Sequence, residues 1–261
     1  MTSFARSAAT KAPFAVALLA TAIAFPSLAL AETRGYDAAG FDTISVSDGV
    51  EAVISEGDFF VEAEARQGDI DRLVVEVDGD RLKIGRDQHL PLGLLQLFRQ
   101  DEFIVTVHLP EVRGINADHG ANVESSVPSA EGAFTAGATG GANLRIAGIV
   151  AERVTADSRS GANLWLEAEA EEVKLAASSG ANLNASGSCG TLHASGRSGA
   201  SLRADDLACE VALLDAASGA SMRAHASETA EASASSGASI ALYGGGEVDA
   251  TENSGGSVRS R

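Results

Sequence analysis

Apolar residues recur in fixed phase along the second half of the chain, with a period of about 19 residues. Each repeat contains a glycine, a small residue, Asn or Ser, and then an aliphatic residue or Met. The eight repeats begin at Gly120, Gly141, Gly161, Gly180, Gly199, Gly219, Gly237 and Gly255. Such a repeat predicts a solenoid, because each coil can bury its apolar face only against the coils beside it.

Inside each repeat, apolar and polar residues alternate, which is typical of half-buried β-strands. Five positions before each glycine stands Ile, Leu or Ala, and three positions after it stands an aliphatic residue or Met. We therefore expect two short strands per coil, with inward side chains stacked in columns and glycines at the corners, where positive φ or a tight bend is needed. The predicted fold is all-β, a parallel β-helix of about eight coils over residues 111–258.

Residues 35–110 lack the repeat and predict a strand-rich N-terminal part of the same domain. Asp78 and Gly79 separate two alternating segments, which indicates a hairpin. The expected strands are 41–46, 51–54, 59–65, 73–77, 81–84 and 103–109. The apolar segment 90–98 predicts a short helix or loop that covers the open end of the solenoid. An exposed patch for a partner or a membrane is the alternative.

Residues 1–31 have the features of a secretory signal peptide: a basic start, a short apolar stretch, and small residues at Ala29 and Ala31. An uncleaved N-terminal anchor is the alternative, although the apolar stretch is shorter than the roughly 20 residues that span a bilayer. We expect cleavage before Glu32, a single mature domain over residues 32–261, and no integral membrane segment after cleavage. The protein would be exported to the periplasm, the cell surface or the medium.

Charge narrows the range of partners. The chain has 19 basic and 36 acidic residues, a formal net charge of -17. This excess of acid argues against nucleic acid and anionic membrane surfaces, since both are polyanions. The charge also keeps a β protein with exposed edges soluble, which is the simpler interpretation.

Cys189 and Cys209 are the two cysteines, and each lies ten residues before a repeat glycine. They therefore occupy the same phase in adjacent coils, whose strands would be about 4.8 Å apart. A disulfide accepts Cα separations of about 4.4–6.8 Å. The spacing allows a bridge between coils, and a pair of free stacked thiols is the alternative.

The order of these features resembles a known family. A signal peptide, a strand-rich opening that ends at Leu109-Pro110, and Gly-Ala-(Asn/Ser)-aliphatic repeats are together similar to the family described as "putative autotransporter adhesin, head GIN domain". The resemblance covers roughly residues 35–258. It implies a parallel, right-handed β-helix in an exported bacterial envelope protein, and it supplies no catalytic residues.

The repeats contain little that predicts catalysis. Some parallel β-helices are polysaccharide lyases or hydrolases, which need clustered carboxylates and bases. The adjacent acidic pairs are Glu171-Glu172 and Asp205-Asp206, both near expected turns, where solvated charge is the usual explanation. The five histidines show no metal-ligand spacing. We expect no enzyme activity, no cofactor and no metal.

Two columns of polar residues are candidate surfaces. Asn or Ser stands two positions after every repeat glycine, which predicts either a ladder that hydrogen-bonds the neighbouring backbone or a binding face. Four positions after the glycines, Arg145, Trp165, Arg203 and Arg223 share a phase. If this column faces outward, it offers guanidinium and indole groups for sugar stacking or carboxylate binding. Ordinary solvated surface is the alternative.

These observations favour an exported, non-enzymatic binding or adhesion protein with a glycan or protein ligand. A carbohydrate-active β-helix enzyme is the first alternative. The second is a structural envelope protein that self-assembles, as a homo-oligomer, through the end of the solenoid.

Overall fold

The computed structural model describes residues 32–87 and 101–261. The predicted signal peptide (1–31) and the apolar segment 90–98 lie outside the described residues. The described residues belong to one compact unit that runs from Ala31 to Arg261. In this part of the chain, no helix has the length and apolar character that a membrane span requires.

The unit is all-β, with one short 3-10 helix among its described residues. The N-terminal part contains β1 (Glu32–Tyr36), β2 (Thr43–Val46), β3 (Glu51–Glu56), β4 (Phe60–Gln67), η1 (Ile70–Arg72), β5 (Leu73–Asp78), β6 (Arg81–Arg86) and β7 (Glu102–Leu109). The repeats contain β8 (Gly114–Ala117), β9 (Asn122–Ser125), β10 (Ala133–Ala138), β11 (Asn143–Ser158), β12 (Asn163–Ser178), β13 (Asn182–Arg197), β14 (Ser201–Ala216), β15 (Ser221–Ser235), β16 (Ser239–Tyr243), β17 (Glu247–Asn253) and β18 (Ser257–Ser260).

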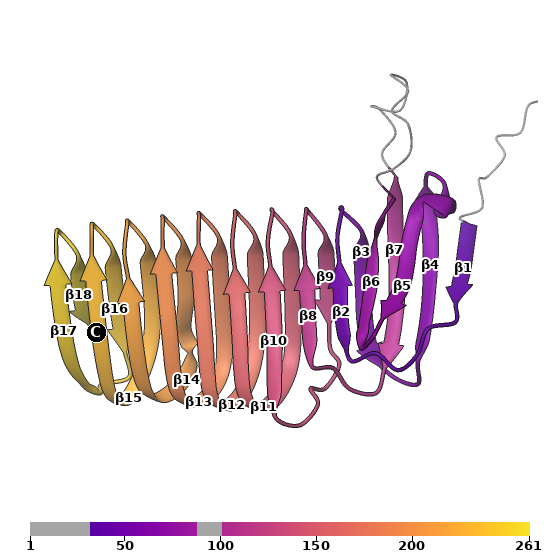
Figure 1. Ribbon diagram of the computed structural model, residues 1–261. Coiled ribbons are helices and arrows are strands. Elements are labelled where there is room, and N and C mark those ends of the chain that lie inside the picture. The colour runs from indigo at the N-terminus through magenta and orange to yellow at the C-terminus, as the bar shows by residue number, and fades with distance from the viewer. Residues whose placement is uncertain (1–31, 88–100) are drawn as a thin grey trace, which may run out of the picture. The chain divides into compact units, whose positions relative to one another are not determined.

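The strands from β8 to β18 form a stack of parallel coils (Figure 1), which confirms the predicted β-solenoid. Each coil pairs in register with the next, so that residues of the same phase lie side by side. Leu144 pairs with Leu164, and Leu164 pairs with Leu183. These side chains are fully buried. Stacking equal phases buries the apolar columns and satisfies the backbone groups of both neighbours at once.

The prediction of two short strands per coil is wrong for the central coils. Each of β11 to β14 is one strand of 16 residues that follows the coil around its wider bend. The backbone keeps its hydrogen bonds through this bend, with register shifts where the chain bulges. At Gly187 (φ +114°) an added Cβ would lie 2.1 Å from the Ala168 carbonyl oxygen, so the bend admits only glycine there.

Tight turns close every coil along the opposite edge (Figure 1). The repeat glycines have positive φ, as expected; Gly161, for example, has φ +74°. The preceding residue is also left-handed, as at Ser160 (φ +53°), and the Ala162 amide donates to the Arg159 carbonyl across the turn. Two positive φ values in a two-residue loop are the pattern of a type I′ turn. The repeat pattern predicts the positive φ of the glycine but not that of the residue before it.

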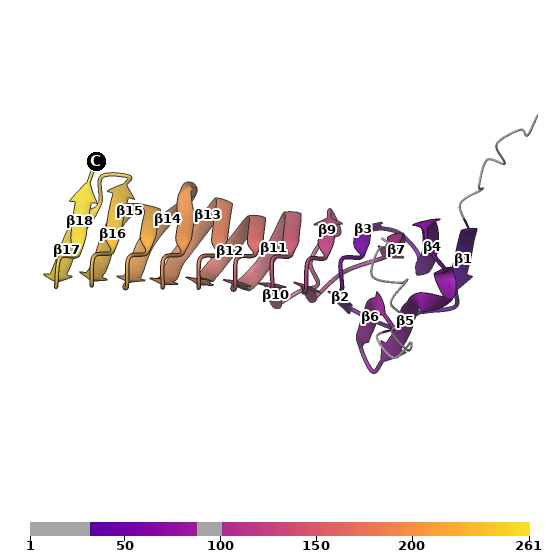
Figure 2. The same ribbon diagram turned by 90° about the horizontal axis from the view of Figure 1, so that it is seen from above.

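The N-terminal strands extend the same core. Strand β2 pairs with β8 and β3 pairs with β9, both in parallel, so the two faces of the solenoid continue into this part (Figure 2). The predicted strands are present, and β1, which was not predicted, pairs antiparallel with β4. The expected hairpin joins β5 and β6. Asp78 pairs with Arg81, so the turn consists of Gly79 and Asp80, one residue later than expected.

Candidate functional site

The outward column four positions after the repeat glycines is the candidate site that the sequence predicts. Register places Arg145 beside Trp165, and Arg203 beside Arg223. Asn184 lies between Trp165 and Arg203 in the same column. The alternation of strand side chains turns these residues outward, while the leucines and alanines between them fill the core. We call Arg145, Trp165, Arg203 and Arg223 the strip.

Side-chain contacts order parts of the strip. The Arg145 guanidinium carbon lies 5.2 Å from the centre of the Trp165 ring, which is a cation–π contact. Arg145 is also 3.4 Å from a Glu124 carboxylate oxygen. Farther along, Arg203 donates a hydrogen bond to Asn184 Oδ1 at 3.5 Å, and Arg223 lies 3.9 Å from Asp205. The guanidinium groups thus have weak partners in solvent, and a ligand can replace them at small cost.

A hollow of about 510 Å³ follows the strip across five coils, from β11 to β15. Trp165 and the arginines line it together with three carboxylates, those of Glu167, Asp205 and Asp206. An indole ring, guanidinium donors and carboxylate acceptors in one open hollow can stack on a sugar ring and bond its hydroxyl groups.

The asparagine column beside the strip is a structural ladder. Asn163 Nδ2 donates to Asn143 Oδ1 at 3.0 Å, and Asn182 Nδ2 donates to Asn163 Oδ1 at 3.0 Å. Of the two predictions for this column, a binding face or a ladder to the neighbouring backbone, the backbone partner is wrong for these asparagines. Coils that stack in register bring identical amides to hydrogen-bonding distance, so the central amide, Asn163, donates to one neighbour and accepts from the other.

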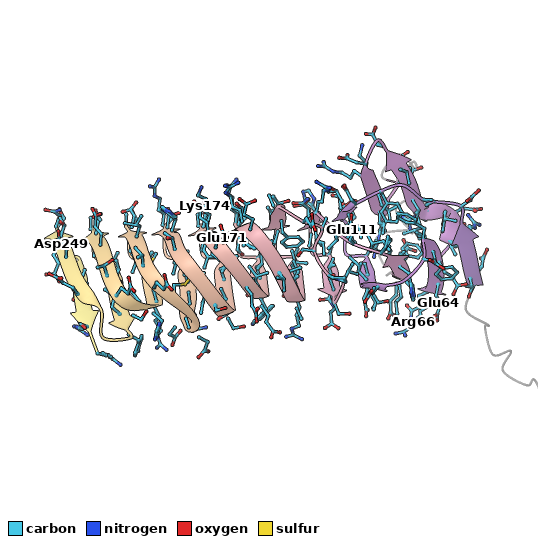
Figure 3. All side chains as sticks on the ribbon, turned by 90° about the horizontal axis from the view of Figure 1, so that it is seen from below. Glu64, Arg66, Glu111, Glu171, Lys174 and Asp249 are labelled. Atoms are coloured by element: carbon cyan, nitrogen blue, oxygen red, sulfur yellow. A yellow bond between two sulfur atoms is a disulfide. The ribbon has the colours of Figure 1, made fainter. Side chains whose placement is uncertain are left out.

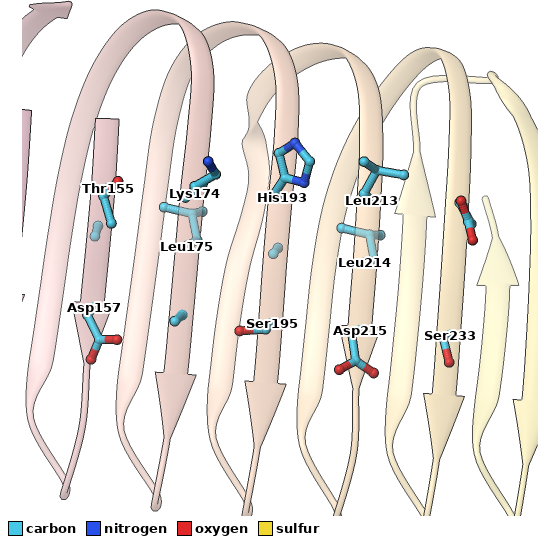
Figure 4. Close-up of a pocket in the computed structure, with 14 residues that line it drawn as sticks. Thr155, Asp157, Lys174, Leu175, His193, Ser195, Leu213, Leu214, Asp215 and Ser233 are labelled. Carbon is cyan, nitrogen blue, oxygen red and sulfur yellow. The ribbon is translucent and has the colours of Figure 1, made fainter. Parts of the chain in front are cut away.

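The opposite face of the solenoid contains a second hollow, of about 480 Å³, which the sequence analysis missed (Figure 4). Lys174, His193 and Leu213 form one row across successive coils, and Asp157, Ser195 and Asp215 are in the next row. The signal was present in the sequence, six and four positions before the repeat glycines. Because these positions share no residue type, the repeat pattern does not single them out as a candidate surface.

Charged groups that line or border this second hollow are held in ion pairs. Glu172 accepts hydrogen bonds from Lys174 (2.8 Å) and Arg153 (2.9 Å), and it lies 3.6 Å from His193 Nε2. The hydrogen bonds from Lys174 and Arg153 lower the pKa of Glu172 to about 2. Beside the second row, Asp157 pairs with Arg159 at 2.7 Å and Asp215 with Arg197 at 3.0 Å. With these groups paired, the hollow is mostly apolar between polar edges.

The acidic pairs do not assemble a metal centre. Glu171 lies at the wider bend of β12 (Figure 3), Glu172 follows it in the same strand, and Asp205 lies in a bulge of β14. Within residues 32–87 and 101–261, His, Cys, Asp and Glu side chains nowhere gather in the groups of three or more that hold a metal ion.

Cys189 and Cys209 form a disulfide between β13 and β14 at the wider bend. Their Cα atoms are 4.5 Å apart, and both side chains point into the core, with 8% and 2% of their surface exposed. The same column contains Ala170 in the coil before and Ala226 in the coil after. The bridge therefore joins two neighbouring coils at a position where the column otherwise holds alanine.

Comparison with known proteins identifies a family and several solved structures of the same fold, but no curated protein sequence. Residues 40–246 match the family model described as "Putative auto-transporter adhesin, head GIN domain". No curated protein sequence matches the chain. Among solved structures, a "putative lipid binding protein" from Parabacteroides distasonis is similar with a TM-score of 0.79 at 14% identity, over 90% of this chain and 98% of that one.

Two further solved structures have the same fold. A "putative adhesin" from Parabacteroides merdae has a TM-score of 0.77 at 14% identity, over 90% of this chain and 97% of that chain. One from Parabacteroides distasonis has a TM-score of 0.75 at 15% identity, over 89% and 97% of the two chains. At such low identity, the likeness establishes the fold.

Proposed function

This chain belongs to the head GIN domain family described as "putative auto-transporter adhesin", and from that premise we propose that it is an exported, non-enzymatic binding protein of the adhesion type. Its ligand is a glycan or a protein, and the strip is the surface that contacts it. Export agrees with the leader-like residues 1–31 and with the disulfide, because disulfides persist in oxidising compartments.

One observation carries this proposal: Arg145, Trp165, Arg203 and Arg223 face outward in a single column beside an open hollow. An indole with a guanidinium on its face suits a sugar ring, which offers C–H groups to the indole and hydroxyls to the arginines. The regular coil holds these groups on strands rather than loops, so little backbone entropy is lost when a ligand binds.

Trp165 is the only tryptophan in the chain, so its fluorescence reports directly on the strip. We expect a glycan that binds there to change the emission saturably. Trp165→Ala should remove binding, which is followed by titration calorimetry because this variant lacks the fluorophore, and Arg203→Ala with Arg223→Ala should weaken binding at least tenfold. Arg66→Ala is the matched control: it lies among the N-terminal strands (Figure 3), and its side chain is 53% exposed against 51% for Arg223.

Three results would decide against the strip. The first is a ligand that binds wild type and Trp165→Ala with equal affinity. The second is a ligand whose binding is weakened as much by Arg66→Ala as by the strip variants. The third is a screen of glycans and envelope proteins that finds no saturable binding. Phosphatidylcholine vesicles belong in the screen, because one structural relative is named for lipid binding.

Location tests the export half of the proposal. Intact cells are treated with a protease that cannot cross the envelope, and the protein is then detected by antibody. Digestion of the protein on intact cells supports display at the surface. Recovery of the full-length protein with its leader in the cytoplasm would refute export.

A further inference from the structure

The C-terminal continuation of the strip contains a group of cationic and hydroxyl side chains around a small central residue. Arg223 pairs with Ala241, and Ala241 pairs with Arg259, in the adjacent strands β15, β16 and β18. Ala241 is therefore flanked by two arginines whose strands lie about 10 Å apart, twice the spacing of a β-ladder. Because the alanine side chain is short, a hollow of about 190 Å³ opens above it.

Hydrogen-bond donors surround this hollow on its other sides. Along β16, the outward residues next to Ala241 are Ser239 and Tyr243. Ser221 and Ser257 flank Ser239 in the neighbouring coils, and Arg261 lies beside Tyr243, since its amide donates to the Leu242 carbonyl. These lining side chains supply guanidinium and hydroxyl donors, and none of them is a carboxylate.

This local composition is opposite to that of the whole chain, which carries 36 acidic residues and a net charge of -17. Arg223 has a distant partner, Asp205, at 3.9 Å. Arg259 and Arg261 form no ion pair within the described part of the chain. At physiological salt the Debye length is about 8 Å, so the three guanidinium groups outweigh acidic residues elsewhere on the surface.

We propose that this hollow, formed by Arg223, Ala241, Arg259, Arg261, Ser239 and Tyr243, binds a single oxoanion: a sulfate, phosphate or carboxylate substituent of a largely neutral glycan. Arginine suits the group because its guanidinium fork matches the geometry of an oxoanion. A densely charged polymer is disfavoured, because its other charges would lie over acidic surface. The hollow shares Arg223 with the strip, so it is one end, or subsite, of a longer glycan site. In this respect the proposal rests on the proposed function.

The test is an amide-shift titration of the folded protein by NMR. Sodium sulfate is added at constant ionic strength, with sodium chloride as the reference salt. We expect saturable shifts in Ser239–Tyr243 and β18. Ala241→Leu fills the hollow and Arg259→Ala removes one guanidinium, and each should weaken sulfate binding at least tenfold. Arg66→Ala, which is also exposed but lies among the N-terminal strands, should bind sulfate like wild type. Shifts that are spread over the surface, or equal in Ala241→Leu and wild type, would overturn the subsite.

A second titration separates a glycan substituent from a free ion. A monosaccharide sulfate should bind at least as tightly as inorganic sulfate, and the same sugar without sulfate should cause no shift in β16. Binding of inorganic sulfate alone would overturn the assignment to a glycan.

Trp165 lies four ladder steps from Ala241, so its emission and the β16 shifts report on different ends of the site. If the sulfate shifts appear but no glycan or envelope protein changes the Trp165 emission, the subsite is supported and the proposed function fails. If a sulfated glycan changes the emission without perturbing β16, the proposed function is supported and the subsite is refuted.

Discussion

Removing the disulfide should destabilise the solenoid by a predictable amount. Cys189 and Cys209 are 20 residues apart in sequence, so the bridge closes a loop of that length in the unfolded chain. Chain entropy for such a loop gives about 3 kcal/mol of stabilisation at 25 °C. The change we propose is Cys189→Ala with Cys209→Ala, because alanine already fills this column at Ala170 and Ala226.

Urea unfolding followed by circular dichroism measures the effect. With a slope of about 2 kcal/mol/M, a loss of 3 kcal/mol lowers the midpoint by about 1.5 M. The slope itself should rise slightly, because the unfolded chain without a cross-link exposes more surface. Hydrogen exchange should show the largest loss of protection in β13 and β14, since coils in a solenoid are coupled to their nearest neighbours.

Reduced wild-type protein is the matched control, because it loses the cross-link and keeps both sulfur atoms. We expect the reduced protein and the double alanine variant to unfold at similar urea concentrations, both well below the oxidised protein. The loop-entropy reasoning is refuted if the oxidised and reduced proteins unfold at the same midpoint while thiol titration confirms that the bridge is present in one and open in the other.

Three further predictions test the turns, the ladder and the charged face. Gly180→Ala should cost about 1–2 kcal/mol in urea unfolding, because its φ is +71°, whereas Gly35→Ala, at ordinary φ with open space around the new methyl, should cost nothing measurable. Asn163→Ala removes two amide hydrogen bonds and should cost about 1–2 kcal/mol, while Asn122→Ala, exposed and outside the amide bonds, should cost less than about 0.5 kcal/mol; equal losses would contradict the ladder. The depressed pKa of Glu172, about 2 against 4.5, means that its ion pairs stabilise the fold above pH 4.5 and are lost as the pH falls toward 2. The stability difference between wild type and Glu172→Gln should therefore shrink over that range, and an NMR titration midpoint near 4.5 for the Glu172 carboxyl would contradict the ion pairs.

Much of the solenoid could be predicted because its neighbours are fixed by phase. In a parallel stack that pairs in register, a residue lies beside its equivalent one repeat away, so a period of about 19 residues already places Leu164 between Leu144 and Leu183. The same rule predicted the order of the strip. Prediction from phase failed outside the repeats. Strand β1 joins the sheet by antiparallel pairing with β4, about 30 residues later, and no periodic pattern in the sequence indicates this pairing.

The candidate surfaces were only partly accessible from sequence. Phase puts Asn143, Asn163 and Asn182 in one column, but whether their amides reach each other or the backbone depends on side-chain rotamers. At the second hollow, both Lys174 and Arg153 contact Glu172, and such contacts between neighbouring coils also depend on side-chain rotamers.

The sequence by itself determined the class of fold, the number and pitch of the coils, and which residues stack on which, because all of these follow from one repeated pattern of burial. The tertiary structure decided how the coil bends. Only the path of the backbone around the wider bend turns Cys189 and Cys209 inward, and only the small side chain of Ala241 between two arginines opens the hollow near the C-terminus. Side-chain direction at a bend and space above a small residue depend on atoms from several coils at once, and no single stretch of sequence contains that information.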